Sequence, residues 1–172
     1  MKTTPEPSIT LEPRTAAHAE ELFAVLSEQR LYEFLDEDPP PSVEALRQKF
    51  ARGETGKSPD GSEHWLNWVV RDEARQVAGY VQATILANSE TYIAYVIASS
   101  HWGRGLAYRA ADQMLRILAA EFGVKTFFAV AERENGRSIR LATRLGFSAA
   151  TPEQSARRAI SASEILMQRV EP

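Results

Sequence analysis

At 172 residues, with 44% hydrophobic residues and three tryptophans, the chain is long enough to bury a sizeable core and too short for a second full domain. Its formal net charge of -3 excludes the broad basic surface that non-specific nucleic-acid binding requires, and the lack of cysteine excludes disulfides, thiolate metal sites and a cysteine nucleophile. We therefore expect a single domain over residues 8–172, preceded by a flexible segment at residues 1–7, with no nucleic-acid partner.

The sequence contains no apolar run long enough to span a bilayer, and residues 1–7 lack the apolar stretch of a secretory signal. We expect a cytoplasmic protein without a membrane partner.

The first third of the chain is predicted to be mostly helical. After a short strand at 8–11, apolar residues at helical spacing follow a possible cap at Thr15. The segment from Leu31 to Pro41 ends in a run of acidic residues and a run of prolines, which predicts a loop. Ser42 then favours the start of a second helix, and Gly53 marks its end.

At His64 the pattern changes to that of strands separated by short turns, which predicts an antiparallel meander. The three predicted strands are 65–70, 76–86 and 91–98. In the second strand, Val77, Val81 and Ile85 are expected to share one face.

The sequence after the meander predicts a long helix followed by a strand, and then one more helix and two more strands. A long amphipathic helix follows the third strand and ends at Gly123, and residues 124–130 are apolar enough for a central strand. We expect the strands before and after this helix to be parallel neighbours. A helix from Asn135 to Leu145 follows, and two strands at 147–151 and 160–170 enclose a polar loop.

The turn before the long helix is the segment most indicative of function. Gly103, Arg104 and Gly105 lead into the first helical turn, where free backbone N–H groups and the helix dipole favour an anion. A nucleotide P-loop needs Gly-Lys followed by Ser or Thr, which is absent here. A dinucleotide fold needs a small residue at Tyr108 and parallel strands upstream, where a meander is predicted. The pyrophosphate of an acyl-CoA remains as the ligand.

Two motifs resemble those of the GNAT superfamily of acyl-CoA-dependent N-acetyltransferases. The first is Trp102-Gly103-Arg104-Gly105-Leu106-Ala107, in which Trp102 departs from the usual first residue of the family motif. A Trp-Gly-basic-Gly string is typical of the subgroup that includes ribosomal-protein N-terminal acetyltransferases. The second motif, from Asn135 to Phe147, is similar to the family's Asn-x-x-Ser or Ala helix that closes in Leu-Gly-Phe. The resemblance extends from about Ile9 to Val170.

This resemblance implies a mixed α/β GNAT fold, with a mostly antiparallel sheet of about six to seven strands, flanking helices and one splayed parallel strand pair. The pantetheine arm of acetyl-CoA would lie between the strands ending at Ala98 and Val130. A backbone N–H near Ile97 would polarise the thioester carbonyl. The implied cofactor contacts are Ile97, Ala98, Ser99, Trp102, Gly103, Arg104, Gly105, Leu106, Ala107, Asn135 and Ser138.

The implied reaction is direct attack on the thioester by a primary amine of a small molecule or a protein N-terminus, with no metal. In many relatives a tyrosine at the position of Ala142 serves as the acid that protonates the leaving thiolate. Here the candidate acids are Tyr95, Ser138 and Tyr108, and the candidate base is Glu90, which immediately precedes the third strand.

Two alternative functions use the same turn. The alanine at position 142 favours a non-catalytic acyl-CoA-binding protein with a regulatory or interaction role, and a nucleotide-binding regulator would use the same anion site.

Variable loops at residues 31–41 and 53–63 are expected to select the amine acceptor. The expected assembly is a monomer or a homodimer.

Overall fold

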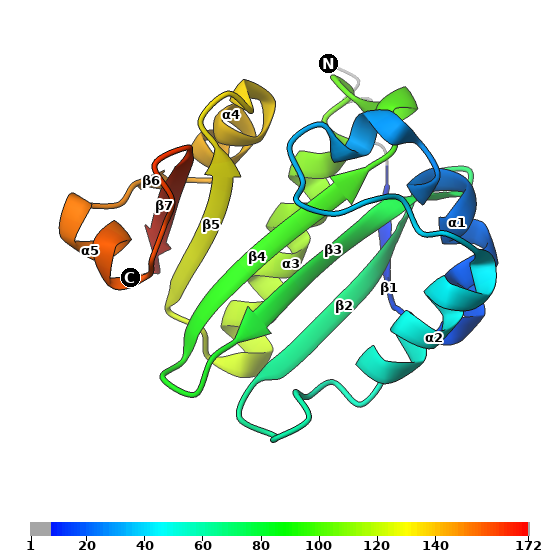
Figure 1. The fold of residues 1–172 in the computed structure, drawn as a ribbon, viewed down its shortest axis with the longest axis horizontal. Coiled ribbons are helices and arrows are strands. Elements are labelled where there is room, and N and C mark those ends of the chain that lie inside the picture. Colours follow the sequence, from blue (N-terminus) through cyan, green and yellow to red (C-terminus); the bar gives the residue numbers. More distant parts are fainter. Residues whose placement is uncertain (1–7, 172) are drawn as a thin grey trace, which may run out of the picture.

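A computed structural model describes residues 8–171, which fold around one seven-stranded sheet (Figure 1). The predicted flexible segment at residues 1–7 lies outside the described residues. The strands, in chain order, are β1 (Thr10–Pro13), β2 (His64–Arg71), β3 (Val77–Ile85), β4 (Glu90–Ile97), β5 (Thr126–Glu132), β6 (Ser148–Ala149) and β7 (Glu164–Val170). Their order across the sheet is β1-β2-β3-β4-β5-β7-β6, and only β4 and β5 are parallel neighbours.

Helices cover both faces of this sheet. The α-helices are α1 (Ala19–Leu26), α2 (Val43–Gly53), α3 (Leu106–Phe122), α4 (Gly136–Arg144) and α5 (Pro152–Arg157). Three short 3-10 turns are η1 (Ala16–His18), η2 (Gln29–Tyr32) and η3 (Ser99–His101). Helix α3 lies behind the sheet in Figure 1, and α1 and α2 lie in front of it. The predicted mixed α/β fold is thereby confirmed.

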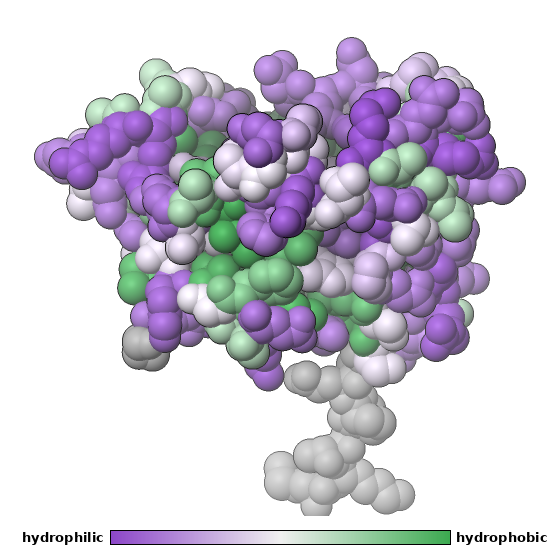
Figure 2. All heavy atoms as spheres, turned by 90° about the horizontal axis from the view of Figure 1, so that it is seen from below, coloured by the Kyte–Doolittle hydropathy of each residue, from purple (hydrophilic) through white to green (hydrophobic). Residues whose placement is uncertain are grey.

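Each face of the sheet has its own hydrophobic core. The larger core lies between the sheet and α3 and includes Met114, Leu118 and Phe127, which are fully buried. The smaller one packs α1 and α2 on the sheet through Leu22 and Phe50. From below, apolar side chains gather in the middle of the surface and polar ones surround them (Figure 2). The two cores fix the sheet between its helical layers.

Local signals explain where several helices begin and end. The Ser42 hydroxyl accepts a hydrogen bond from the backbone N–H of Ala45 at 3.0 Å, which caps α2 as predicted. Gly123 ends α3 in the left-handed conformation, as predicted. The predicted polar loop near the C-terminus contains α5, because Thr151 and Gln154 form a reciprocal capping box at its start.

One predicted strand face is wrong because of a β-bulge. Val70 pairs with Gly79 but Arg71 pairs with Val77, so β3 has one extra residue at this point. The extra residue reverses the alternation of side chains. Val77 therefore packs against the core under α1 and α2, whereas Val81 and Ile85 lie in the core under α3.

The parallel pair β4 and β5 is joined at one end only. The register runs from Glu90 opposite Thr126 to Tyr92 opposite Phe128 and then stops. Beyond it the two strands diverge, toward the top of Figure 1. This geometry confirms the predicted splayed pair. In the described part of the chain, no helix is long and apolar enough to cross a membrane.

Candidate functional site

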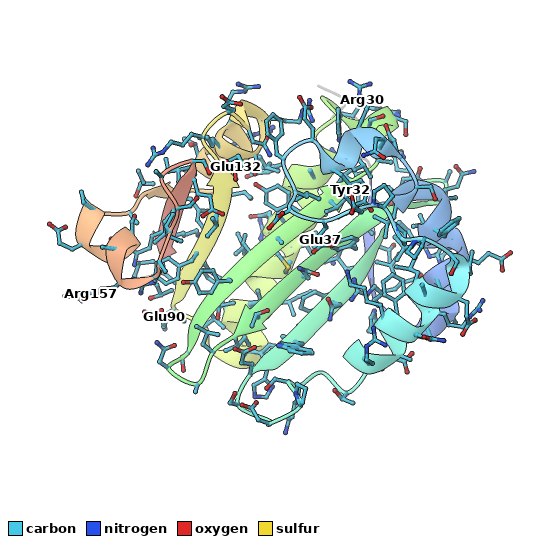
Figure 3. The ribbon with its side chains drawn as sticks, in the orientation of Figure 1. Arg30, Tyr32, Glu37, Glu90, Glu132 and Arg157 are labelled. Atoms are coloured by element: carbon cyan, nitrogen blue, oxygen red, sulfur yellow. The ribbon has the colours of Figure 1, made fainter. Side chains whose placement is uncertain are left out.

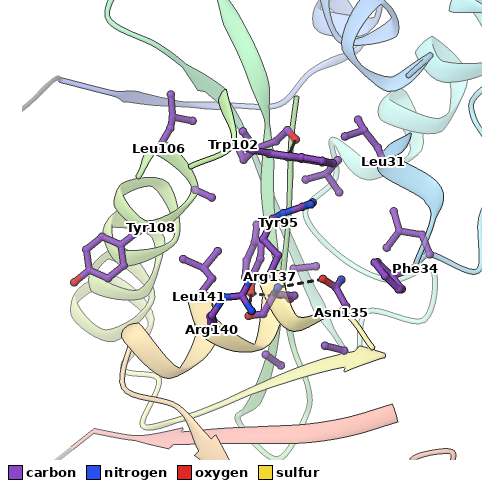
Figure 4. A pocket seen from close by; sticks show the side chains of 18 of the residues that line it. Leu31, Phe34, Tyr95, Trp102, Leu106, Tyr108, Asn135, Arg137, Arg140 and Leu141 are labelled. Carbon is purple, nitrogen blue, oxygen red and sulfur yellow. Dashed lines mark hydrogen bonds between the residues drawn. The ribbon is translucent and has the colours of Figure 1, made fainter. Parts of the chain in front are cut away.

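A cleft of about 540 Å³ opens where β4 and β5 diverge. On one side it is lined by the first residues of α3 and by α4, and on the other by residues 30–35, which begin in η2 (Figure 4). Because the strands have separated, the cleft is lined from both faces of the sheet, by α3 on one face and by the segment around Leu31 on the other. A ligand and its reaction partner can therefore approach one point from opposite sides.

The edge of β4 presents free backbone groups to this cleft. Ala98 donates its N–H to the carbonyl of Ala78 at 2.8 Å, so the even-numbered residues of β4 bond to β3. Antiparallel alternation then directs the backbone groups of Tyr95 and Ile97 away from β3, toward the gap. The carbonyl of Ile97 accepts a hydrogen bond from the Trp102 indole at 2.9 Å. The N–H groups of Tyr95 and Ile97 and the Tyr95 carbonyl remain for a ligand.

The turn before α3 forms an anion site at the mouth of the cleft. Gly103 and Gly105 both have φ of +74°, which glycine adopts without strain. In residues 8–171, their N–H groups donate to no carbonyl or side chain. The first N–H groups of α3 also lack partners within the helix. Leu106 is buried and anchors the turn in the core.

Trp102 ties the turn to both sides of the cleft. The guanidinium carbon of Arg137, on α4, lies 3.5 Å from the centroid of the indole ring, and that of Arg30, on η2, lies 5.1 Å away. Figure 4 shows the ring lying across the cleft above Arg137. Cation-π contacts of this kind hold the cleft walls together at the position of the turn.

Tyr95 connects the open edge of β4 to α4. Its hydroxyl lies 3.1 Å from the backbone carbonyl of Ser138, to which it donates, and 3.0 Å from the Ser138 hydroxyl. Asn135 caps the same helix by accepting the Ser138 N–H at 3.1 Å. Burial raises the pKa of Tyr95, so this hydroxyl keeps its proton at neutral pH.

The cleft gathers most of the residues that the sequence motifs indicated. Those that line it are Tyr95, Ile97, Trp102, Gly103, Gly105, Leu106, Ala107, Tyr108, Asn135 and Ser138. Ala98 and Ser99 do not line it, and both backbone N–H groups are occupied: that of Ser99 donates to the Glu28 carboxylate at 3.2 Å. Arg104 lines a separate cavity of about 230 Å³ together with His101.

Glu90 lies away from this constellation. It begins β4 at the end where β4 and β5 are still paired, and its carboxylate forms an ion pair with Arg158. Figure 3 shows Glu90 at the opposite end of the strand pair from Glu132. The structure therefore does not bring Glu90 together with Tyr95 and Ser138.

Two carboxylates that the motifs did not indicate line the cleft. Glu132 ends β5 and is half-buried, and Glu33 is exposed in the segment that follows η2. A sequence signal existed for Glu132, because ligands of open sheets bind beyond the carboxyl ends of parallel strands. Glu33 lies in an irregular segment without a pattern of this kind. Within residues 8–171, no group of acidic, histidine or cysteine side chains is suited to hold a metal ion.

Solved structures share this architecture. RimL, a ribosomal α-N-protein acetyltransferase in complex with coenzyme A, superposes with a TM-score of 0.78 at 18% identity, covering 95% of this chain and 94% of that one. Spermidine N-acetyltransferase from Vibrio cholerae, in complex with CoA and spermine, gives 0.74 at 16% identity, covering 94% and 95%. An aminoglycoside acetyltransferase in complex with coenzyme A gives 0.73 at 16% identity, with 95% of each chain covered.

Sequence comparison identifies the family. No curated protein matches the chain significantly. The family model described as an acetyltransferase (GNAT) domain matches residues 8–148, which include the splayed strands, the glycine turn and α4. The chain therefore belongs to the GNAT family of acetyltransferases.

Proposed function

We propose that this acetyltransferase transfers the acetyl group of acetyl-CoA to a primary amine of a small molecule or of a protein N-terminus. One observation carries the proposal: the open edge of β4 and the glycine turn before α3 face the same cleft. The turn offers N–H groups for the pyrophosphate, and the edge offers alternating donors and acceptors for the pantetheine amides.

The thioester would lie beside Tyr95, with its carbonyl oxygen accepting a backbone N–H of β4. That hydrogen bond strengthens as the neutral amine attacks and negative charge develops on the oxygen. Collapse of the tetrahedral intermediate forms the amide bond, breaks the carbon-sulfur bond and releases the CoA thiolate. The amine loses one proton, which protonates the thiolate or passes to water.

The hydroxyls of Tyr95 and Ser138 are placed to assist the departing sulfur. Ala142, the alternative position for an acid, is buried and has no ionisable side chain. The raised pKa makes Tyr95 a poor base, and its hydroxyl proton, which is donated to the Ser138 carbonyl, would have to turn toward the sulfur to assist its departure. We infer that the Tyr95 and Ser138 pair stabilises the thiolate until it gains a proton.

The acceptor amine would enter from the side of residues 30–35. Ala94 is exposed on this face of β4, so the sheet leaves room for a substrate beside the thioester. Glu33 and Glu132 give this side of the cleft negative charge, which attracts an ammonium group. We infer that Glu132, the less exposed of the two, accepts the proton of the bound ammonium.

Release of free thiol tests the proposal. The purified protein is incubated with acetyl-CoA and a panel of polyamines, aminoglycosides and peptides with free N-termini, and a thiol reagent follows the product. We expect release above the amine-free rate with at least one class of amine. Binding of acetyl-CoA without release for every class would instead support a non-catalytic acyl-CoA-binding protein.

A further inference from the structure

The acceptor side of the cleft, formed by residues 30–35 and by the facing parts of β4 and β5, is mainly apolar. In the described part of the chain four large apolar side chains are exposed, and two of them, Leu35 (41%) and Val130 (38%), line this cleft. Leu31 and Phe34 are half-buried and line it as well, on the wall opposite α3 (Figure 4). Exposed apolar side chains that gather in a cleft favour a ligand with an apolar surface of its own.

The floor of the acceptor side is one face of β4 and β5. On β4, side-chain alternation places Ala94 on the face opposite Ile93, which is buried in the core under α3. On β5, the same alternation places Val130 opposite Ala129, which belongs to that core too. Ala94 and Val130 are both exposed, so the two strands present an apolar surface to the acceptor.

A carboxylate lies at the open end of this floor. Glu132 follows Val130 by two positions on β5, so the two side chains share a face and their Cα atoms are roughly 7 Å apart. Among the residues that the structure describes, Glu132 has no ion-pair partner. A cationic nitrogen bound at Glu132 therefore has apolar surface beside it, toward the paired end of the strands.

The paired end of the floor carries aromatic rings and a positive charge. Tyr92 and Phe128, the last paired residues of β4 and β5, stack with their ring centroids 5.5 Å apart. Alternation puts Phe128 on the same face as Val130, and the guanidinium carbon of Arg158 lies 4.2 Å from the centroid of its ring. The carboxylate nearby, that of Glu90, is already paired with Arg158. A second cationic group of a ligand would find no free carboxylate here.

We propose that the acceptor is a primary monoamine with an apolar body, which binds its ammonium group at Glu132 and lays its hydrocarbon part on Val130, Leu35 and Phe34. The inference rests on the proposed function and names the class of amine. Contact with an apolar body removes these side chains from water. A second ammonium group, or the hydroxyl and amide groups of a sugar or a peptide, would lose hydrogen bonds to water that apolar side chains cannot replace.

Thiol-release kinetics with three amines test the proposal on the wild-type protein. Hexylamine and hexane-1,6-diamine share a six-carbon chain and differ in the second ammonium group, and trialanine presents a peptide N-terminus. We expect kcat/KM for hexylamine to exceed that for each of the other two at least about tenfold, because only hexylamine buries no further polar group.

Two valines on strands provide matched variants. Val130→Thr keeps the shape of the side chain and places a hydroxyl on the apolar floor, so kcat/KM for hexylamine should fall about three- to tenfold. The ratio of kcat/KM for hexylamine to that for the diamine should fall with it, which a loss of folded protein would not cause. Val170→Thr makes the same change on β7, outside the cleft at a side chain that is 63% exposed, and it should leave both values unchanged.

Two results would overturn the proposal while the proposed function stands. One is a kcat/KM for the diamine or for trialanine that equals or exceeds that for hexylamine in the wild type. The other is an unchanged ratio of hexylamine to diamine in Val130→Thr. No thiol release with these three amines or with the panel of polyamines, aminoglycosides and peptides would contradict the proposed function as well.

Discussion

Tyr95 is the residue through which the open strand edge and α4 act together, because its hydroxyl reaches both the carbonyl and the hydroxyl of Ser138. Tyr95→Phe should lower kcat about tenfold or more, since a hydrogen bond to a developing thiolate is lost. The KM for acetyl-CoA should stay the same, because the backbone of β4 is unchanged. Steady-state kinetics measure both values, and an unchanged kcat would remove Tyr95 from the reaction.

The two glutamates at opposite ends of the splayed strand pair offer a matched comparison. Glu132→Gln should lower kcat/KM for the amine at least about tenfold, because a carboxylate that accepts the ammonium proton is lost. Glu90→Gln makes the same chemical change where β4 and β5 are still paired, and it should leave kcat/KM intact. The measurement is kcat/KM as a function of pH for both variants. A loss in Glu90→Gln with none in Glu132→Gln would assign the base to Glu90.

For individual residues, the sequence predicted the backbone conformation of the glycine turn better than it predicted which carboxylate lies in the cleft. Gly103, Gly105 and Asn135 take the conformations that their motifs require, because glycine and cap preferences are local properties of the chain. The location of Glu90 depends on which end of the strand pair opens. That is decided by long-range pairing of β4 with β5, and no local pattern records it.

At the scale of elements, Gly79 on β3 leaves no room for a side chain beside β4. Its φ is +152°, and a Cβ there would meet the carbonyl oxygen of Val96 at 2.0 Å. Gly79→Ala should therefore lower the free energy of unfolding by more than about 3 kcal/mol. Gly61, with φ of +74° and open space around its Cα, is the control: Gly61→Ala should cost about 1 kcal/mol. Similar losses in denaturant unfolding of the two variants would contradict the role given to Gly79.

The β-bulge in β3, opposite Val70 and Arg71, shows which features of the strands the sequence pattern did not predict. The periodicity of apolar residues predicted the long helices and the order of most strands, because burial of a face imposes a period on the sequence. The switch of Val77 to the other face came from one extra residue in β3, which alternation alone does not reveal. Helix α5 was missed for a different reason, since it is short and lacks an apolar stripe.

At the scale of the whole molecule, the raised pKa of Tyr80 makes the folded protein less stable at alkaline pH. Burial, with a smaller contribution from Glu37, raises the pKa of Tyr80 from 10.0 to about 12. Between these two values the unfolded chain releases a proton that the folded protein keeps, so stability falls as pH rises above about 10. The expected slope is about 1.4 kcal/mol per pH unit for each such tyrosine.

Urea unfolding across this range measures the effect of Tyr80. Tyr80→Phe should fall less steeply than the wild type between pH 10 and 12 and run parallel to it from pH 7 to 9. Parallel curves throughout would show that Tyr80 titrates equally in both states. Sequence alone predicted a packed hydrophobic core and the overall fold, but the burial of individual tyrosines depends on tertiary packing.

Calorimetric titration of the purified protein with acetyl-CoA tests whether the splayed cleft is an acetyl-CoA site. Free CoA and ATP serve as comparison ligands, and Gly105→Glu places a carboxylate where the pyrophosphate would lie. We predict micromolar binding of acetyl-CoA and CoA by the wild type, little binding of ATP, and loss of binding in a folded Gly105→Glu protein. Equal binding by that variant, or no binding by the folded wild type, would show that acetyl-CoA does not bind in this cleft.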